Sequence, residues 1–523
     1  MRKRNVLTAL AAAALVLQVA VINAGPSMAQ TTTPEVAFDF SPTSGLAGTK
    51  ISFTGTGCPH STAANSTLDG LVFLTQGNET PINPTEFTSD GEGKFSAQVD
   101  TTGLAPGQYT TFAVCATTDK GGPGSPFTVN APVIQGSTYF PLSPGRVLDT
   151  RNGTGTGGVI ETLGAADSLD VRVTGVLGVP ATGVTAVALN VVATDATGPP
   201  SFLTVWPTGQ NRPVASNLNV VPGVSVPNLV IARVGADGKV SMYNNAGTVN
   251  VAADVQGYFL GDGTGSTYLP LTPARVLDTR NGTGGTSAPV GPGSTIELKV
   301  TDAGGVPATG GTAVALNVTA TNASGAESYL TVWPSGASRP VASNLNFIKG
   351  QTVPNLVIAR VGDGGKVSIY NNVGNVDVVA DTQGWFAAPA AAGAVPPGSQ
   401  YFPTNPARIL DTRDGTGVPE GRTGQLGSPA TLDLQVRGAG GVPENATAVV
   451  LNVTVTGSPG PDSYLTVYPT GADRPLASNL NFVAGQTVAN LVIAKIGNGG
   501  KVTIYNNLGQ TFVIGDVQGW FTA

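Results

Sequence analysis

The sequence is poor in charge and in the side chains that enzymes most often use. Only 11% of its 523 residues are charged, and it contains one histidine, His60. A Ser-His-Asp or Cys-His site needs a histidine, so no region that lacks one can build such a site. The sequence also contains no zinc-binding spacing such as HExxH. The sequence therefore predicts a protein that is not an enzyme.

The sequence lacks a basic patch beyond its first few residues, and its formal net charge is −6. Nucleic-acid partners select clusters of Lys and Arg, so the composition argues against a nucleic-acid partner. Beyond residue 29 the sequence has no run approaching the roughly 20 apolar residues of a spanning helix. A membrane span is therefore not expected.

The residues that are abundant favour strands and turns. Gly occurs 71 times and Pro 39 times, and Val, Thr and Asn are common. Such a composition is typical of short strands joined by tight turns. Residues 1–29 carry a basic head, an apolar stretch and the small-residue end "SMA". They are predicted to be a secretory signal peptide, with a signal anchor as the alternative.

One phrase occurs three times: "RVLDTRNGTG" from Arg146, "RVLDTRNGTG" from Arg275 and "RILDTRDGTG" from Arg408. Around it, "LTVWPxG", "RPVASNLN", "GKVSxYNN" and "DVQGYF" also return in order. The period is the size of a domain, so each copy is expected to bury its own core. The modules are expected to run 137–260, 267–387 and 400–523. Residues 388–399 form an Ala/Pro/Gly linker. The modules are therefore predicted to be independent domains, arranged like beads on a string, with a looser connection between the second and third.

Residues 30–130 do not match the repeat. Alternating apolar residues and frequent turn signals predict a small immunoglobulin-like antiparallel sandwich. Cys58 and Cys115 are the only cysteines. In an exported chain such a pair predicts a disulfide, with two buried thiols as the alternative.

Each repeat is expected to contain eight or nine strands and no sustained helical period. The predicted fold class is all-β, with tandem antiparallel β-sandwiches of jelly-roll or Greek-key type. A propeller or a trefoil is the alternative. The segments "NLVIARV" and "VDVVAD" are apolar on both faces, which predicts central strands between packed layers.

On these motifs the repeats resemble a module found in secreted proteins of actinobacteria and some neighbouring phyla. The resemblance covers about three quarters of the chain. It implies an accessory extracellular module, often appended to peptidases, cell-wall hydrolases or lectin-like domains. It brings no catalytic residues with it.

The repeated phrase is predicted to be a structural corner. An Asp at the end of a strand can accept backbone N–H groups two residues on, and the following Arg can clamp that carboxylate. The corner residues are Asp149 and Arg151, Asp278 and Arg280, and Asp411 and Arg413. The alternative is a calcium loop formed by Asp149, Asn152 and nearby carbonyls. Otherwise no cofactor or metal is expected. A distant alternative pairs Asp149 with Asp254 as the carboxylates of a glycoside hydrolase.

The strand "FLTVWP" and its copies are the candidate ligand-binding sites. Alternate residues share one strand face, so two aromatic rings per module could stack on sugar rings if that face is open. The rings are Phe202 and Trp206, Tyr329 and Trp333, and Tyr464 and Tyr468. The alternative is that they fill the core or an interface. The arginines of "RPVASNLN" are expected in turns or along a shallow polar groove.

These features predict a secreted or loosely wall-associated protein that binds weakly and at several sites. The expected partners are a glycan or cell-wall polymer, or extracellular proteins, and tandem copies would raise avidity. The alternative is a surface-layer or matrix component that assembles through contacts between modules.

Overall fold

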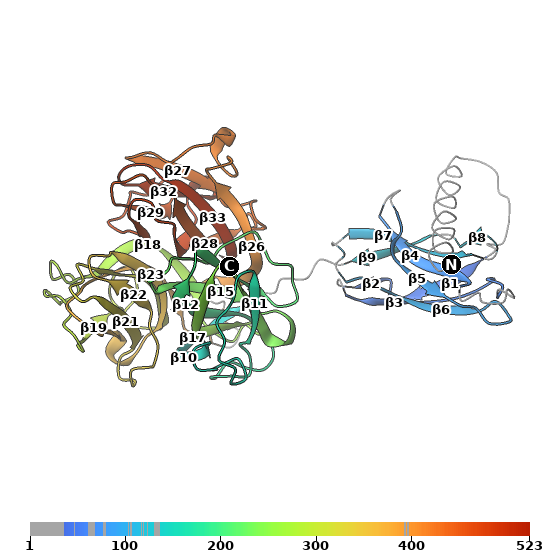
Figure 1. Cartoon of the computed structure of the whole chain (residues 1–523), viewed down its shortest axis with the longest axis horizontal. Helices are drawn as coiled ribbons and strands as arrows, with labels where there is room; N and C mark the ends of the chain where they lie inside the picture. The colour runs from blue at the N-terminus through green and yellow to red at the C-terminus, as the bar shows by residue number, and fades with distance from the viewer. Residues whose placement is uncertain are drawn as a thin grey trace. The chain divides into compact units, whose positions relative to one another are not determined.

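The computed structural model describes residues 36–523, with gaps at 46–47, 61–67, 77–79, 103, 105–106, 117, 119, 123, 130–135, 392–393 and 395–396. The predicted signal peptide lies outside these residues. The described residues form two compact units, which divide after residue 133 (Figure 1). The predicted all-β class is confirmed, since 56% of the residues are in strands and 3% are helical. None of the helices in the described ranges has the length and apolarity needed to cross a membrane.

The first unit has the strand order of an immunoglobulin-like sandwich. One sheet has the order β1-β3-β6 and the other β2-β9-β7-β4-β5, with β8 paired to β7. The strands are β1 (Ala37–Ser41), β2 (Ser44–Gly45), β3 (Lys50–Thr56), β4 (Gly70–Thr75), β5 (Ile82–Phe87), β6 (Phe95–Asp100), β7 (Gly107–Cys115), β8 (Lys120–Gly121) and β9 (Ser125–Val129).

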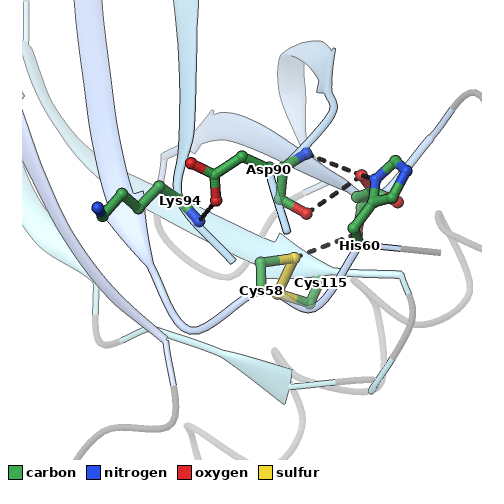
Figure 2. Close-up of a disulfide and its surroundings, with 7 residues drawn as sticks. Cys58, His60, Asp90, Lys94 and Cys115 are labelled. Carbon is green, nitrogen blue, oxygen red and sulfur yellow. Dashed lines mark hydrogen bonds and ion pairs between the residues drawn. A yellow bond between two sulfur atoms is a disulfide. The ribbon is translucent and has the colours of Figure 1, made fainter. Parts of the chain in front are cut away.

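The predicted disulfide joins Cys58, just after β3, to Cys115 at the end of β7, with their Cα atoms 5.6 Å apart. Figure 2 shows the disulfide with His60 beside it. The His60 ring lies 2.8 Å from the carboxylate of Asp69, which also accepts a hydrogen bond from the backbone N–H of Ser89. The single histidine therefore has a structural contact in the first unit.

Each repeat forms two four-stranded antiparallel sheets. The first module consists of β10 (Thr138–Asp149), β11 (Asp167–Arg172), β12 (Val184–Thr197), β13 (Ser201–Pro207), β14 (Leu218–Val220), β15 (Val226–Arg233), β16 (Lys239–Asn244) and β17 (Thr248–Leu260). Its sheets have the orders β10-β17-β12-β15 and β11-β16-β13-β14. Successive strands mostly alternate between the sheets, which is the jelly-roll arrangement of two Greek keys.

The other two modules repeat this order strand for strand. The second consists of β18 (Thr267–Asp278), β19 (Thr295–Lys299), β20 (Gly311–Thr321), β21 (Glu327–Pro334), β22 (Leu345–Ile348), β23 (Val353–Arg360), β24 (Lys366–Asn371) and β25 (Asp377–Ala387). The third consists of β26 (Gln400–Asp411), β27 (Ala430–Gln435), β28 (Ala446–Thr456), β29 (Ser463–Pro469), β30 (Leu480–Phe482), β31 (Val488–Lys495), β32 (Lys501–Asn506) and β33 (Phe512–Thr522). The short 3₁₀ turns are η1 (Ala236–Gly238), η2 (Asp363–Gly365), η3 (Pro419–Gly421) and η4 (Asn498–Gly500).

Each module has its own aliphatic interior between its two sheets. The modules nevertheless do not behave as beads on a string, because a further core joins all three. This shared centre is formed by the outer faces of β10, β12, β15 and β17 and of their copies. Its residues are Tyr139, Ala186, Ala188, Leu229, Ile231 and Phe259; Tyr268, Ala313, Ala315, Leu356, Ile358 and Phe386; and Tyr401, Ala448, Val450, Leu491, Ile493 and Phe521.

The shared centre corrects the interpretation of "NLVIARV". Its strand β15 is an edge strand of its sheet, not a central one. It is apolar on both faces because Val230 and Ala232 face the module interior while Leu229 and Ile231 face the shared centre.

The contacts between modules close into a ring. Short β-bridges join Tyr139 to Ser266, Tyr268 to Ser399, and Tyr401 to Ser137. Each bridge therefore connects one module to the next, and the last returns to the first. The aromatic contacts follow the same cycle, with ring centroids 4.4 Å apart for Tyr139–Phe386, 4.4 Å for Tyr268–Phe521 and 4.5 Å for Tyr401–Phe259. The three modules are thus related by an approximate threefold axis.

A close backbone approach explains the glycine in "DTQGWF" and its copies. The ring of Tyr268 lies across Gly384, where a Cβ atom would be 2.2 Å from the tyrosine oxygen. Any larger residue would displace this aromatic ring from the shared centre.

Candidate functional site

The repeated corner is held by hydrogen bonds to one carboxylate. Asp149 ends β10 and accepts from the backbone N–H of Arg151 at 3.1 Å. It also accepts from Nε and Nη2 of the same arginine at 2.9 and 2.8 Å. The second and third modules have the same contacts between Asp278 and Arg280 and between Asp411 and Arg413. The corner thus combines an Asx-turn with a two-pronged arginine clamp.

A further arginine, which the sequence prediction did not include, ties the corner to the last strand. Arg146 donates from Nη1 to Asp149 at 2.5 Å and from Nε to Asp254 at 2.6 Å. Arg275 and Arg408 make the equivalent contacts. Hence a guanidinium group bridges the two acids of each module that the glycoside hydrolase alternative pairs, such as Asp149 and Asp254.

The pKa values of the two acids in each module are shifted in opposite directions. The hydrogen bond from Arg151 lowers the pKa of Asp149, and the bond from Arg280 lowers the pKa of Asp278 to about 2. In contrast, burial raises the pKa of Asp254, against the effect of its contact with Arg146. The ionised form of Asp149 is thus stabilised, whereas burial disfavours the ionised form of Asp254.

The oxygens of the calcium alternative already have protein partners. The Asp149 carboxylate accepts from the two arginines, and Asn152 Oδ1 accepts from the backbone N–H of Thr154 at 3.0 Å. In the third module Asp414 accepts from Thr416 N–H at 2.9 Å. The described residues contain no group of three or more His, Cys, Asp or Glu side chains placed to hold a metal ion.

The aromatic strand does not present two open rings. Trp206, Trp333 and Tyr468 are 8%, 6% and 7% exposed. The following loop contacts Trp206 and Trp333, and Trp206 also lines a small pocket with Thr404 and Pro406 of the third module. Trp206 Nε1 donates to the carbonyl of Gln210 at 3.0 Å, and Trp333 Nε1 to that of Ala337 at 2.9 Å. Phe202, Tyr329 and Tyr464, at the other end of the strand, remain half-buried. Each module therefore has one accessible ring instead of a pair.

The loop of "RPVASNLN" places a cation and an apolar side chain at the surface. The Arg212 guanidinium lies 3.8 Å from the ring centroid of Tyr243, and Arg339 and Arg474 lie 3.6 and 4.0 Å from Tyr370 and Tyr505. Such stacking holds the guanidinium in one place without a carboxylate partner. Two residues further along, Val214, Val341 and Leu476 are 83%, 86% and 79% exposed.

Two grooves between modules bring this loop to the arginine corner of a neighbour. The 3–1 groove, of about 400 Å³, lies between the third and first modules. Its principal residues are Phe202, Arg212, Val214, Arg408, Arg413, Thr454 and Thr456. The 2–3 groove, of about 320 Å³, lies between the second and third modules. Its principal residues are Tyr464, Arg474, Leu476, Arg275, Arg280, Thr319 and Thr321. These are the same motif positions in both grooves.

The first and second modules meet in the same way. Asn190 Nδ2 donates to the carbonyl of Ser343, and the backbone N–H of Ser343 donates to Asp254. This contact brings the loop that carries Arg339 to the corner of the first module. We call this contact the 1–2 interface.

A central pocket of about 310 Å³ lies beside both grooves. It is formed by the starts of β15, β23 and β31, including Val226, Val353 and Val488. Asn219 and Thr487 line both this pocket and the 3–1 groove. Thr352, Tyr464 and Asn481 line both this pocket and the 2–3 groove. The three hollows therefore adjoin one another on the three-module unit, and together we call them the branched cleft.

The sequence indicated part of this cleft. Phe202, Tyr464 and the corner arginines Arg280 and Arg413 were singled out and lie in the grooves. The sequence analysis missed Thr319 and Thr454, although a polar Thr where the first module has Val192 is an available signal.

No family model and no curated protein matches the chain. Among solved structures, it is similar to a Salmonella alpha-2-macroglobulin reacted with methylamine, with 10% identity over 91% of this chain and 28% of that chain and a TM-score of 0.16. It is also similar to a tetra-tandem repeat in the extending region of a large adhesion protein, with 13% identity, 92% and 95% coverage and a TM-score of 0.13. A trypsin-activated alpha-2-macroglobulin from Escherichia coli gives 10% identity, 94% and 31% coverage and a TM-score of 0.16. The chain thus spans less than a third of the macroglobulins' length, and likenesses this low carry no information on function.

Proposed function

We propose that this is an extracellular binding and display protein whose three-module unit engages a glycan or partner protein in the branched cleft. The disulfide supports a location outside the cytoplasm, because such bonds persist in oxidising compartments. The predicted signal peptide and the resemblance to a secreted actinobacterial module agree with this location.

The observation that carries the proposal is the recurrence of one set of side chains in two grooves. Each groove combines a half-buried aromatic ring, an exposed aliphatic side chain and three arginines. Ligand sites commonly combine apolar walls with a few fixed polar groups. An exposed Val or Leu at the same place in every module has no packing role within its own module, but it would contact a ligand.

The fixed arrangement of the modules favours multivalent binding. Since the shared centre holds the grooves in place, a ligand that fills one is already close to the next. The second contact is then intramolecular, and avidity can exceed the affinity of a single groove. A long polymer would gain most from this arrangement.

The test is retention of the intact chain on peptidoglycan, chitin and cellulose. Truncating both groove rings, Phe202→Ala with Tyr464→Ala, should weaken retention by about tenfold or more, since each stacking contact contributes about 1 kcal/mol. The matched control is Ile160→Ala, which removes a side chain that is 70% exposed and lies away from the grooves. Equal retention of the double variant and the control would contradict binding in the cleft.

The closed arrangement of the three modules gives less support to the alternative of a surface-layer or matrix component. It requires modules of different chains to bind one another, but each module already uses its binding faces within its own chain. A closed ring limits further growth through the same surface. Sedimentation across a wide concentration range should therefore give one species, and reversible growth into large assemblies would favour the matrix alternative.

The proposal includes no catalysis. In each module the two acids of the glycosidase alternative are bridged by an arginine. A glycosidase needs one carboxyl group free to give a proton and another free to act as nucleophile or base. Release of reducing sugar ends from any retained glycan would overturn this part of the proposal.

A further inference from the structure

The charged side chains that line the two grooves are all arginines. In the 3–1 groove, Arg408 and Arg413 form ion pairs with Asp411 and Asp516, which compensate their charges. Arg212 has no such balance, because among the described residues it forms no ion pair and lies over Tyr243. The 2–3 groove repeats this pattern with Arg474 as the unbalanced cation. Each groove therefore carries one positive charge in excess, in a protein of net charge −6.

A second observation comes from two buried hydroxyl groups. Thr454 and Thr319 are 1% and 4% exposed, and each lines its groove. Within the described part of the chain neither hydroxyl has a hydrogen-bond partner. Leaving a buried hydroxyl unpaired costs about 1–3 kcal/mol. An oxygen atom of a ligand in the groove would remove that cost.

We infer that the 3–1 and 2–3 grooves each bind the carboxylate of an acidic glycan. The inference rests on the proposed function and names its ligand class. The carboxylate lies between the arginine of the loop and the corner arginines, where planar guanidinium groups offer paired N–H donors. The sugar ring packs against Phe202 or Tyr464, and the exposed aliphatic side chain covers its edge. The threonine hydroxyl donates to a ligand oxygen.

The aromatic wall favours a uronic acid over a bare oxyanion. A phosphate or sulfate ion would use the arginines but would leave the ring and Val214 or Leu476 without a partner. A charged sugar uses both. The branched cleft also suits a polymer, since the central pocket between the grooves is lined by neutral side chains apart from Asp462.

The chain supplies its own internal control. The position of Thr319 and Thr454 is occupied by Val192 in the first module. The 1–2 interface therefore has the arginines but lacks the hydroxyl. We expect two sites of similar affinity on the intact protein and a weaker third at most.

The experiment is calorimetric titration of the intact protein with trigalacturonate and with its fully methyl-esterified form. The two ligands have the same sugar rings and differ in charge. The acid should bind at two sites, and the ester should bind at least about tenfold more weakly, because a hydrogen bond to a charged group contributes about 1.5–3 kcal/mol. Affinity for the acid should also fall as NaCl is raised.

Variants then assign the sites. Arg212→Gln should abolish one of the two sites, and Arg474→Gln the other. Thr454→Val, which copies the first module, should weaken the 3–1 site by about threefold to tenfold. Arg339→Gln, at the 1–2 interface, is the matched control and should leave both sites intact. The NaCl dependence of the unaltered protein is a second measurement that needs no variant.

Each outcome decides the inference. Equal binding of the acid and the ester would overturn it but leave a glycan-binding cleft. Binding of a glycerol phosphate oligomer without trigalacturonate would show an anion site of the wrong class. If the protein neither bound trigalacturonate nor was retained on peptidoglycan, chitin or cellulose, both the inference and glycan binding in the proposed function would fail.

Discussion

The interior of each module and the shared centre between modules are both buried, but they are built differently. The interior of the first module contains mainly Val and Leu side chains from both of its sheets. The shared centre contains six aromatic rings and five alanines beside seven larger aliphatic side chains. At its border lie buried amide side chains. Aliphatic packing tolerates many arrangements of similar volume, whereas large rings beside alanines fit in one arrangement.

The amide side chains form a cycle of hydrogen bonds around the axis. Asn228 donates to Asn452 at 2.9 Å, Asn355 to Asn190 at 2.8 Å, and Asn490 to Asn317 at 3.0 Å. A shift of one module against another would leave these polar groups buried and unpaired. The comparison teaches that burial holds the modules together, while the amide pairs fix how they face one another.

The largest effect is expected from a charge placed in the shared centre. Ile231 is 2% exposed and faces the other modules. Ile231→Asp would bury an unpaired carboxylate, at a cost of about 4 kcal/mol or more. The first module should then leave the ring while its own interior remains intact. Small-angle scattering should report a larger radius of gyration, with the β-type circular dichroism spectrum retained.

The control for this variant is Val159→Asp in the same module, whose side chain is 54% exposed. It should leave both the radius of gyration and the melting temperature within error of the parent. An unchanged radius for Ile231→Asp would mean that the shared centre does not hold the modules together.

A smaller effect is expected from one amide. Asn228 donates to the carbonyl of Asn217 and to Asn452, and accepts from the backbone N–H of Leu491. Asn228→Ala leaves three buried partners unpaired, so the free energy of unfolding should fall by about 2–4 kcal/mol. Urea denaturation measures this change, and Asn245→Ala, at an exposed turn, is the matched control. A loss below that of the control would contradict the role given to the amide cycle.

A single hydroxyl tests the aromatic part of the centre. Tyr139 Oη donates to the carbonyl of Gln256 at 3.1 Å. Tyr139→Phe keeps the ring contact and removes only this bond, so the free energy of unfolding should fall by about 1 kcal/mol. The same substitution at Tyr243, whose hydroxyl is exposed and bonds weakly at 3.5 Å, should cost less. If both substitutions had the same effect, the buried bond would contribute nothing specific.

Much of the module could be predicted from the sequence, because strand faces follow from alternation. Leu316 and Val318 alternate with Ala315 and Asn317, and the first pair faces the module interior. What covers the other face is not encoded in the pattern. A strand that is apolar on both faces looks the same whether the second layer belongs to its own module or to a neighbour. For this reason β15 was predicted as a central strand.

The candidate site shows a second limit. In a regular strand Arg146 and Asp149 would point to opposite faces, because they are three residues apart. A register shift between Arg146 and Leu148 lets their side chains meet. The sequence did not indicate this bulge, so it predicted the clamp from Arg151 and missed the one from Arg146. Likewise, strand alternation placed Phe202 and Trp206 on one face but could not show that only the second ring is buried.

Acid should distinguish the corners from the shared centre, with an effect no larger than that of Tyr139→Phe. The ionisable groups of the centre are three tyrosines, whose pKa values are raised by burial and stay far above acidic pH. In the corner of the second module, the pKa of Asp278 is lowered to about 2, chiefly by Arg280. A lowered pKa in the folded state stabilises the fold above the unfolded value of about 3.9. That stabilisation is lost as the pH falls towards 2.

The measurement is the difference in free energy of unfolding between the parent and Asp278→Asn at several pH values. The variant should be less stable at pH 7, and about 1 kcal/mol of the difference should disappear between pH 4 and pH 2, since the half-exposed Arg280 is partly screened by water. In an Arg280→Gln background this pH-dependent part should shrink, because the main cause of the pKa shift is gone. Burial raises the pKa of the neighbouring Asp381, so its protonation acts in the opposite direction, and comparing two proteins that share Asp381 cancels most of its contribution. A difference that stays constant from pH 7 to pH 2 would mean that the ionised corner does not stabilise the module, and that its stability comes from the same uncharged packing as the shared centre.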